Sequence, residues 1–542
     1  MDEFHVTAGR RLAPHVAFAP RLACKLAEEG YVNRADRLQR LLAAPLLLVV
    51  TACTPSPRRS DAVAHRSGGP RVTHGIAAGE VTQTSAVIWS RCERAGELHV
   101  VLDAVPRGQP IAKSAAALAE NDFTAKVTVA GLEPSTSYPY RVWCTAGAGE
   151  STVTGDAVGG RFRTAPSPDS PEAVRFVWGG DVGGQNVCRD RTEGYPIFQR
   201  IASQDADFFI GLGDMIYADS PCLATGRYGN QQIPGPPKPA TDVPEFWAYW
   251  KYNRSDEASQ QVLAMTPYYA VWDDHEVFDD FGPHHDVGPS PPYPAGRHLL
   301  PLGRKAFLDY NPLADPPLLY RTIRWGKHLE LFVLDTRSYR DPNSQQDDPR
   351  HPKTMLGLEQ LRWLKESLLR SDATWKVIVT SVPLSVPTGS KQRGRDGWLP
   401  FDQQTGFQYE LLDILRFMRA HDIRNNLWIS TDIHFVAVFR YAPLPEDPTF
   451  LSYEVDTGPL NAGVFPKREF DTTLHPEQLF RYPDDANPAH GFEVAKSWFN
   501  YGVMRVDAQG NVHIAVINTS GATLYELSLE PSAERRSGGA KR

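Results

Sequence analysis

Short runs of alternating apolar and polar residues fill the chain from 71 to 166, with turn residues between them. Clear examples are 86–92 (AVIWSRC), 125–130 (AKVTVA) and 138–144 (YPYRVWC). A period of two indicates strands that bury one face, and a succession of such strands is typical of an antiparallel sandwich. The sequence therefore predicts an all-β sandwich over 71–166, preceded by a flexible linker over 54–70 that is rich in Pro, Ser, Gly and Arg.

From residue 172 the pattern changes to apolar strands that alternate with helices. The strand candidates are 174–178 (VRFVW), 207–212 (DFFIGL), 268–272 (YYAVW), 329–334 (LELFVL), 376–381 (KVIVTS) and 426–430 (NLWIS). The segment 357–371 (GLEQLRWLKESLLRS) places its leucines on one face of a helix. Nearly all-apolar strands that alternate with such helices indicate a sheet covered by helices. We therefore expect an α/β domain over 172–530 and a disordered tail over 531–542.

Polar side chains, most of them acidic, follow five of these apolar strands directly. They are Asp181; Asp214 with Tyr217 and Asp219; Asp273 and Asp274 with His275, Glu276, Asp279 and Asp280; Asp335 with Arg337; and Asp432 with His434. One aspartate at a strand end is most often a helix cap or a turn former. The carboxyl ends of strands in an open α/β sheet converge on one crevice, however, so five coinciding endings favour a shared site.

Several carboxylates in one poorly hydrated crevice repel each other, and a bound multivalent cation removes that cost. Carboxylates, a phenol and an imidazole form a hard ligand set that suits iron, calcium, manganese or zinc better than copper. More than four such ligands indicate at least two ions that share a bridging carboxylate. Sites of this kind mostly hydrolyse phosphoesters or amides.

The order of the motifs resembles one known family. GD followed by Tyr217, then WDDHE (272–276), LDTRSYR (334–340) and DIH (432–434) resemble the PhoD-like alkaline phosphatase and phosphodiesterase family, within the calcineurin-like metallophosphoesterases. The resemblance extends over about 71–530. It implies a four-layer α/β/β/α metallophosphoesterase sandwich with an N-terminal fibronectin III or Ig-like all-β domain, and a di- or trinuclear site that holds calcium and iron.

The same resemblance implies roles for individual residues. Asp214 would bridge two ions, and Tyr217 would bind a ferric ion through its phenolate. The implied metal ligands are Asp181, Asp214, Tyr217, Asp274, Asp280, Asp432 and His434. His275 would support the leaving group and Arg337 would clamp the phosphate, so these two are the predicted catalytic residues.

The chain departs from the family pattern at two positions. Asp181 stands where the best-known members have a cysteine that ligates iron, and Cys188 is not expected to replace that cysteine. An all-oxygen and nitrogen site leaves manganese and zinc open beside calcium and iron. Thr431 stands where a glycine commonly precedes the aspartate, but both candidate ligands after it are present.

The predicted function is metal-dependent hydrolysis of phosphate mono- or diesters, in which a metal-bound hydroxide attacks phosphorus directly. The net charge of −7 argues against a nucleic-acid-binding surface. Two alternatives stay open. One is a phospholipase D-like phosphodiesterase that acts on lipid head groups, and the other is a catalytically silent binding protein of the cell surface.

The N-terminal region predicts export. Residues 34–53 (RADRLQRLLAAPLLLVVTAC) place arginines before an apolar run that is too short to span a bilayer, and the final VTAC resembles a lipobox. Residues 1–53 are therefore expected to form a lipoprotein signal peptide, with lipidation at Cys53 and a true start downstream of the first methionine. We expect a monomer in the periplasm or at the cell surface, attached to the membrane only through lipid.

Cysteine usage follows from export. An oxidising environment favours paired thiols, and four cysteines remain after Cys53. We predict the pairs Cys92 with Cys144 and Cys188 with Cys222, because each pair lies within one predicted domain. Four buried free thiols are the alternative.

Overall fold

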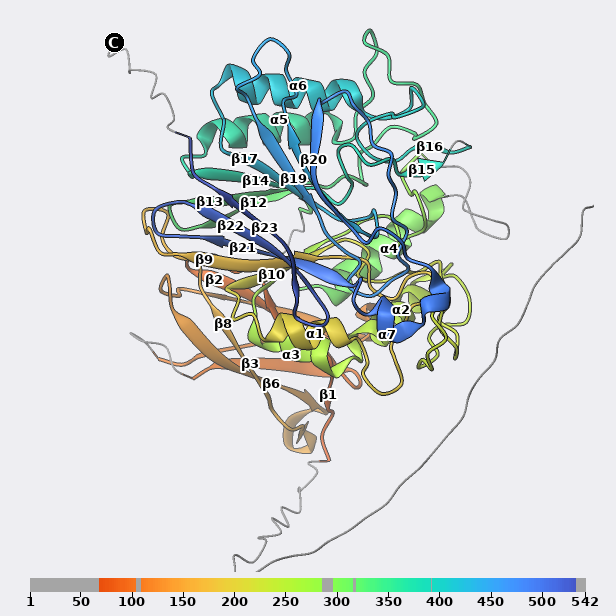
Figure 1. Cartoon of the computed structure of the whole chain (residues 1–542). Helices are drawn as coiled ribbons and strands as arrows, with labels where there is room; N and C mark the ends of the chain where they lie inside the picture. Colours follow the sequence, from red (N-terminus) through yellow and green to blue (C-terminus); the bar gives the residue numbers. More distant parts are fainter. Residues whose placement is uncertain (1–67, 104–108, 285–295, 315–317, 391, 533–542) are drawn as a thin grey trace, which may run out of the picture. The chain divides into compact units, whose positions relative to one another are not determined.

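The computed structural model describes residues 68–103, 109–284, 296–314, 318–390 and 392–532 (Figure 1). The chain divides into two compact units, and all of these residues belong to the second unit, His65–Arg542. The predicted signal peptide with Cys53, most of the predicted linker and nearly all of the predicted tail lie outside the described residues.

The first large sheet has nine strands in the order β23–β22–β21–β9–β10–β11–β1–β2–β5. Its parallel centre consists of β9 (Val174–Gly179), β10 (Phe208–Leu212) and β11 (Tyr268–Val271). Beyond β9 follow the antiparallel strands β21 (Asn500–Val506), β22 (Val512–Asn518) and β23 (Thr523–Leu529). Strands β10 and β11 are buried along their whole length and β9 is buried except at Arg175, as their apolar sequences predict.

Strands from the N-terminal segment complete the same sheet. They are β1 (Val72–Gly79), β2 (Ser85–Cys92) and β5 (Thr124–Ala130). Strand β1 pairs in parallel with β11 at Gly79 and Tyr268. The predicted all-β character of this segment is confirmed. The boundary between the two predicted domains stays a prediction, because their strands share one sheet.

The remaining N-terminal strands form a five-stranded antiparallel sheet. They are β3 (Gly96–Leu102), β4 (Ile111–Ala117), β6 (Ser137–Ala146), β7 (Val153–Thr154) and β8 (Val158–Arg163). Apolar side chains such as Ile88, Val100 and Val142 fill the space between this sheet and the β1–β2–β5 edge. The arrangement buries one face of each alternating strand, which is what the period of two requires.

The second large sheet has seven strands in the order β12–β13–β14–β17–β19–β18–β20. Its bounds are β12 (Arg321–Trp325), β13 (Leu329–Val333), β14 (Trp375–Val379), β17 (Asn426–Ser430), β19 (Ser452–Asp456), β18 (Val436–Tyr441) and β20 (Pro476–Tyr482). The central strands β13, β14, β17 and β19 run parallel. A separate hairpin pairs β15 (Gly389–Ser390) with β16 (Gly394–Arg395).

Helices cover the outer faces of the two large sheets (Figure 1). The helices of the described residues are α1 (Pro196–Ala202), α2 (Val243–Arg254), α3 (Glu257–Met265), α4 (Gly296–Tyr310), α5 (Gly357–Arg370), α6 (Gln408–Ala420) and α7 (Phe492–Ala495), and the 3₁₀ turns are η1 (Ala119–Asn121), η2 (Gly149–Ser151) and η3 (Pro488–His490). Helices α5 and α6 lie against the outer face of the seven-stranded sheet. Helices α1 and α3 lie on the opposite side of the molecule, beyond the nine-stranded sheet.

The two sheets stack on an apolar layer that both supply. Phe176 and Ile210 come from the nine-stranded sheet, and Leu331, Val377 and Ile429 come from the other. All five side chains are fully excluded from solvent. The predicted four-layer α/β/β/α arrangement is thereby confirmed. Because the sheets face each other, the ends of strands from both of them can meet at one site.

Both predicted disulfides are present. Cys92 with Cys144 joins β2 to β6, and Cys188 with Cys222 joins the segments that follow β9 and β10. Within the ranges that the structure describes, no helix is both long and apolar enough to cross a bilayer.

Candidate metal centre

The acidic strand ends of the two large sheets meet in one cluster. Four groups of side chains each bring their ligand atoms within 4.8 Å of one another: Asp181, Asp214 and His434; Asp214, Asp274 and His275; Asp273, Asp274 and Asp432; and Asp274, Asp280 and Asp396. Asp214 belongs to two of these groups and Asp274 to three, so the four groups form one continuous site. The structure therefore brings together residues from four separate stretches of the sequence: Asp181; Asp214; Asp274 and Asp280; and Asp432 and His434.

The backbone at these positions is unusual. Asp181, Asp214, Asp280, Asp432 and His434 have positive φ values of 63°, 53°, 59°, 73° and 59°. The left-handed region is costly for residues other than glycine, although Asp and His tolerate it better than most. Residues held there gather at functional sites, where the surrounding structure enforces the conformation. Five such residues in one cluster therefore indicate a functional site.

Several carboxylate oxygens in the cluster lack a hydrogen bond within the described part of the chain. The Oδ2 atoms of Asp181, Asp214 and Asp432 are buried and have no hydrogen-bond donor among the described residues. Burial raises the pKa of these three carboxyls well above its usual range, and neighbouring aspartates add to the effect. Bound cations would satisfy these oxygens and keep the carboxylates ionised. The donor set of carboxylates, one imidazole and one phenol fits hard metal ions.

His434 presents one defined nitrogen to the cluster. Its Nδ1 lies 2.6 Å from the carbonyl oxygen of Gly463, so Nδ1 carries the proton and Nε2 is left with its lone pair. Burial lowers the pKa of His434 to about 3, which keeps the ring neutral. The hydroxyl of Tyr217 lies 3.0 Å from that Nε2 and 3.3 Å from Oδ1 of Asp181. These three side chains therefore face one common point.

His275 is oriented by a carboxylate outside the ligand groups. Its Nδ1 lies 2.8 Å from Oδ1 of Asp219, whose Oδ2 accepts a hydrogen bond from the backbone N–H of Asp279. The other ring nitrogen, Nε2, lies 3.8 Å from Oδ1 of Asp279. Burial alone would lower the pKa of His275, but the charges of Asp219, Asp274 and Asp214 outweigh it and hold that pKa well above the usual range. The geometry therefore leaves a ring that Asp219 orients beside Asp214 and Asp274.

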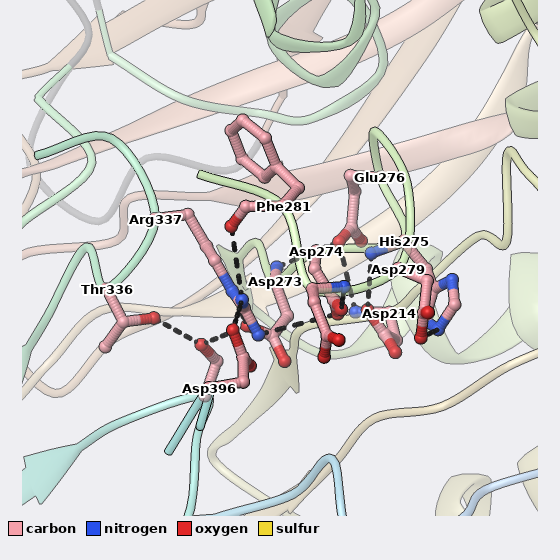
Figure 2. Close-up of polar contacts among 12 residues, drawn as sticks. Asp214, Asp273, Asp274, His275, Glu276, Asp279, Phe281, Thr336, Arg337 and Asp396 are labelled. Atoms are coloured by element: carbon pink, nitrogen blue, oxygen red, sulfur yellow. Dashed lines mark hydrogen bonds and ion pairs between the residues drawn. The ribbon is translucent and has the colours of Figure 1, made fainter. Parts of the chain in front are cut away.

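Glu276 connects the two loops that carry the shared aspartates (Figure 2). Its Oε2 accepts hydrogen bonds from the backbone N–H groups of Asp214, at 3.1 Å, and Asp273, at 2.9 Å. Its Oε1 accepts from the N–H of Met215 at 2.8 Å. The loop after β10 is thereby fixed against the loop after β11. The sequence marks Glu276 only as one of the acids that follow β11, without this role.

Arg337 is buried inside the cluster rather than at its mouth. Figure 2 shows its guanidinium reaching between Asp273 and Asp396. Nε donates to Oδ1 of Asp273 at 2.5 Å, and Nη1 donates to Oδ1 of Asp396 at 2.7 Å and to the carbonyl oxygen of Phe281 at 3.3 Å. Nη2 lies 3.5 Å from Oδ1 of Asp274 and makes no hydrogen bond to a described residue. The predicted contact of Arg337 with phosphate stays a prediction.

Asp396 is the cluster member that sequence analysis missed. It follows the two-residue strand β16, so it has no apolar strand before it to mark its position. Its Oδ1 accepts hydrogen bonds from Arg337, Arg340 and Asn343. These three donors hold the pKa of Asp396 well below its usual range against the effect of burial. Asp396 therefore stays ionised within the cluster.

Comparison with known proteins decides the family. Residues 176–514 match the family model described as PhoD-like phosphatase, and residues 57–166 match the PhoD-like phosphatase, N-terminal domain. The chain belongs to the PhoD-like phosphatase family. The resemblance seen in its motifs is thereby confirmed.

Two relatives of this PhoD-like chain are informative. The alkaline phosphatase D of Bacillus subtilis (strain 168) is 24% identical over 407 residues, which make up 67% of this chain and 64% of that protein. The alignment thus spans less than two thirds of that relative. The solved structure titled "Structure of PhoD" superimposes with a TM-score of 0.65 and 18% identity, and the match covers 86% of this chain and 94% of that one. It shows that the two chains share a fold.

Proposed function

We propose that this PhoD-like chain hydrolyses phosphate mono- or diesters at the acidic cluster. The observation that carries the proposal is the linkage of four ligand groups through Asp214 and Asp274 into one buried site. A cluster of this kind suits two or more ions that share a bridging carboxylate. Membership of the PhoD-like phosphatase family and the alkaline phosphatase D relative support the same reaction class.

The ligand groups suggest how the ions would be shared. Asp181, Tyr217 and His434 would hold one ion, Asp274, Asp280 and Asp432 would hold the others, and Asp214 would bridge. Calcium with iron is the family expectation, and manganese or zinc would also suit the oxygen and nitrogen donors. Once bound, the ions would neutralise phosphate charge and acidify the attacking water.

His275 is the proposed general acid. Asp219 fixes its ring through Nδ1, so Nε2 is the nitrogen that can meet the leaving group. As the phosphorus–oxygen bond to the alcohol breaks, His275 would pass the proton on Nε2 to the departing oxygen, while the oxygen of water forms the new bond to phosphorus. The proton that water loses would pass to solvent, from which Nε2 is protonated again. Arg337 would donate to a phosphate oxygen through Nη2, the nitrogen that has no hydrogen bond to a described residue.

Export is part of the proposal. The two disulfides support an oxidising compartment, since such bonds are rare in the reducing cytosol. We place the protein in the periplasm or at the cell surface as a monomer, anchored through lipid on Cys53. Labelling of Cys53 by a lipid precursor in cells tests the anchor, and a Cys53→Ala variant that stays membrane-bound would contradict it.

An activity panel tests the proposed reaction. Purified protein is assayed on p-nitrophenyl phosphate, bis(p-nitrophenyl) phosphate and phosphatidylcholine vesicles. Asp214→Asn serves as the site variant, and Asp413→Asn, which alters an exposed side chain paired with Lys365, serves as the matched control. We expect hydrolysis of a soluble ester by the wild type and the control alone. Release of head group from the vesicles only would favour the lipid phosphodiesterase. No hydrolysis at all would favour the binding protein.

A further inference from the structure

The buried arginines of the cluster have few donors to offer a substrate. The side chains of Arg337 and Arg340 are both 0% exposed. Arg337 uses Nε and Nη1 on Asp273, Asp396 and Phe281, and Arg340 uses its Nε on the carbonyl oxygen of Thr336 and its Nη1 on Asp396. Because both side chains are excluded from solvent and held by these contacts, neither can turn a two-nitrogen fork toward an incoming phosphate. A second cation at the open side of the cluster would supply that grip.

Arg393 occupies that open side. Its side chain is 31% exposed, and its Nη2 lies 2.8 Å from Oδ2 of Asp280 and also contacts the carboxylate of Asp279. Its Nη1 donates to the backbone oxygen of Asp279 at 3.4 Å. Asp280 belongs to the ligand group with Asp274 and Asp396, whereas the side chain of Asp279 is 42% exposed. Arg393 therefore spans from a buried ligand group to solvent.

The hairpin that carries Arg393 is anchored to the cluster. Gly394 has a φ of 94°, and a Cβ there would lie 2.2 Å from the carbonyl oxygen of Asn343, so only glycine fits. The side chain of Asn343 in turn donates to Oδ1 of Asp396 at 2.8 Å. The backbone N–H of Arg393 donates to the hydroxyl of Ser390 at 3.1 Å. The hairpin that carries Arg393 is thus packed against Asn343, which also holds Asp396.

We propose that Arg393 binds the phosphate group of the substrate or product by exchanging its contact with Asp280 for phosphate oxygens, while Asp279 keeps the side chain beside the cluster. A cation held by Asp280 would repel the guanidinium, which would favour the exchange of that contact for an anion. The planar fork of arginine matches two oxygens of a tetrahedral phosphate. This inference rests on the proposed function and makes Arg393 a catalytic residue, in addition to Arg337 and His275.

The test measures phosphate binding rather than turnover. Inorganic phosphate is titrated calorimetrically into the metal-loaded full chain and into Arg393→Met, Arg393→Lys and Arg350→Met. Arg350→Met is the matched control, because it removes the same charge from a side chain that is 86% exposed. We expect Arg393→Met to weaken phosphate binding about 10- to 100-fold and Arg393→Lys to weaken it less. Metal content by elemental analysis and phosphate affinity of the control should not change.

Two results overturn the inference. One is wild-type phosphate affinity in Arg393→Met, and the other is loss of metal from that variant, which would make Arg393 a support for the acids alone. Should Arg393→Met fail to fold, Arg393→Lys decides by the same criteria. The proposed function fails separately: a wild-type protein that hydrolyses no ester contradicts it, whatever the phosphate titration of the variants shows.

Discussion

The carboxylate of Glu276 accepts a hydrogen bond from the backbone N–H of Asp214 at 3.1 Å, although the two residues are 62 positions apart in sequence. The loop that supplies Asp274 and His275 therefore depends on the loop that supplies Asp214. The geometry of the metal site therefore depends on this backbone contact as well as on the ligands.

Glu276→Gln should loosen the site without removing a ligand. An amide offers one acceptor oxygen where the carboxylate offers two, so at least one buried N–H loses its partner. We expect the free energy of unfolding to fall by about 1–3 kcal/mol and metal affinity to fall about 10- to 100-fold. Denaturant titration and metal titration check the two effects. Glu366→Gln, on the exposed face of α5, is the control, and equal metal affinity in both variants would contradict this role.

Asp219→Asn should impair protonation of the leaving group. Asp219 holds the ring of His275 and raises its pKa, so the amide leaves a misoriented imidazole with a lower pKa. We expect kcat to fall about tenfold or more for an alkyl phosphate and much less for p-nitrophenyl phosphate, whose leaving group needs little protonation. The alkaline limb of the pH profile should move to lower pH. Equal losses on the two substrates would show that Asp219 acts in another way.

The disulfide between Cys92 and Cys144 should stabilise the N-terminal strands without affecting the metal centre. It joins β2 to β6 and closes a loop with a sequence separation of 52. We expect the double variant Cys92→Ala/Cys144→Ala to lose about 2–5 kcal/mol of unfolding free energy and to keep its metal content. Chemical denaturation and elemental analysis measure both quantities. Loss of metal from this variant would contradict the prediction, because it would show that the disulfide also supports the metal site.

His74 should make the fold sensitive to acid. Burial lowers its pKa to about 4, and the charges of Arg91 and Lys251 add to the effect. The unfolded chain takes up this proton near pH 6.5 and the folded chain does so only near pH 4, so stability is lost as the pH falls through that window. We expect the free energy of unfolding to fall by about 2 kcal/mol over this window. This is less than the full pKa shift would give, because the ring is partly exposed to solvent.

The variant that tests this effect is His74→Asn, since asparagine tolerates the φ of 61° at this position. Its unfolding free energy should fall less steeply between pH 6.5 and 4 than that of the wild type. His513→Asn, with a side chain that is 45% exposed, is the control. If the unfolding free energy of His74→Asn falls with pH as steeply as that of the wild type, groups other than His74 cause the acid sensitivity.

The sequence predicted the strands of the site because their hydrophobic signal is strong. β9, β10, β11, β13 and β17 are short, almost wholly apolar runs, and the residues after them form the cluster. Asp396 and Arg393 could not be found in this way, since the strands beside them have two residues each and no apolar pattern. The pairing of β1 with β11 could not be predicted either, because alternation of apolar and polar residues indicates a strand but not the strand with which it pairs.

The number of metal ions per chain tests the central claim most directly. We predict that elemental analysis of the purified wild-type protein finds two or more ions, and that Asp214→Asn, which lacks the shared carboxylate, holds fewer while Asp413→Asn holds the same number as the wild type. A wild-type chain that retains no metal after purification in metal-supplemented buffer, yet hydrolyses phosphoesters at full rate, would contradict the account.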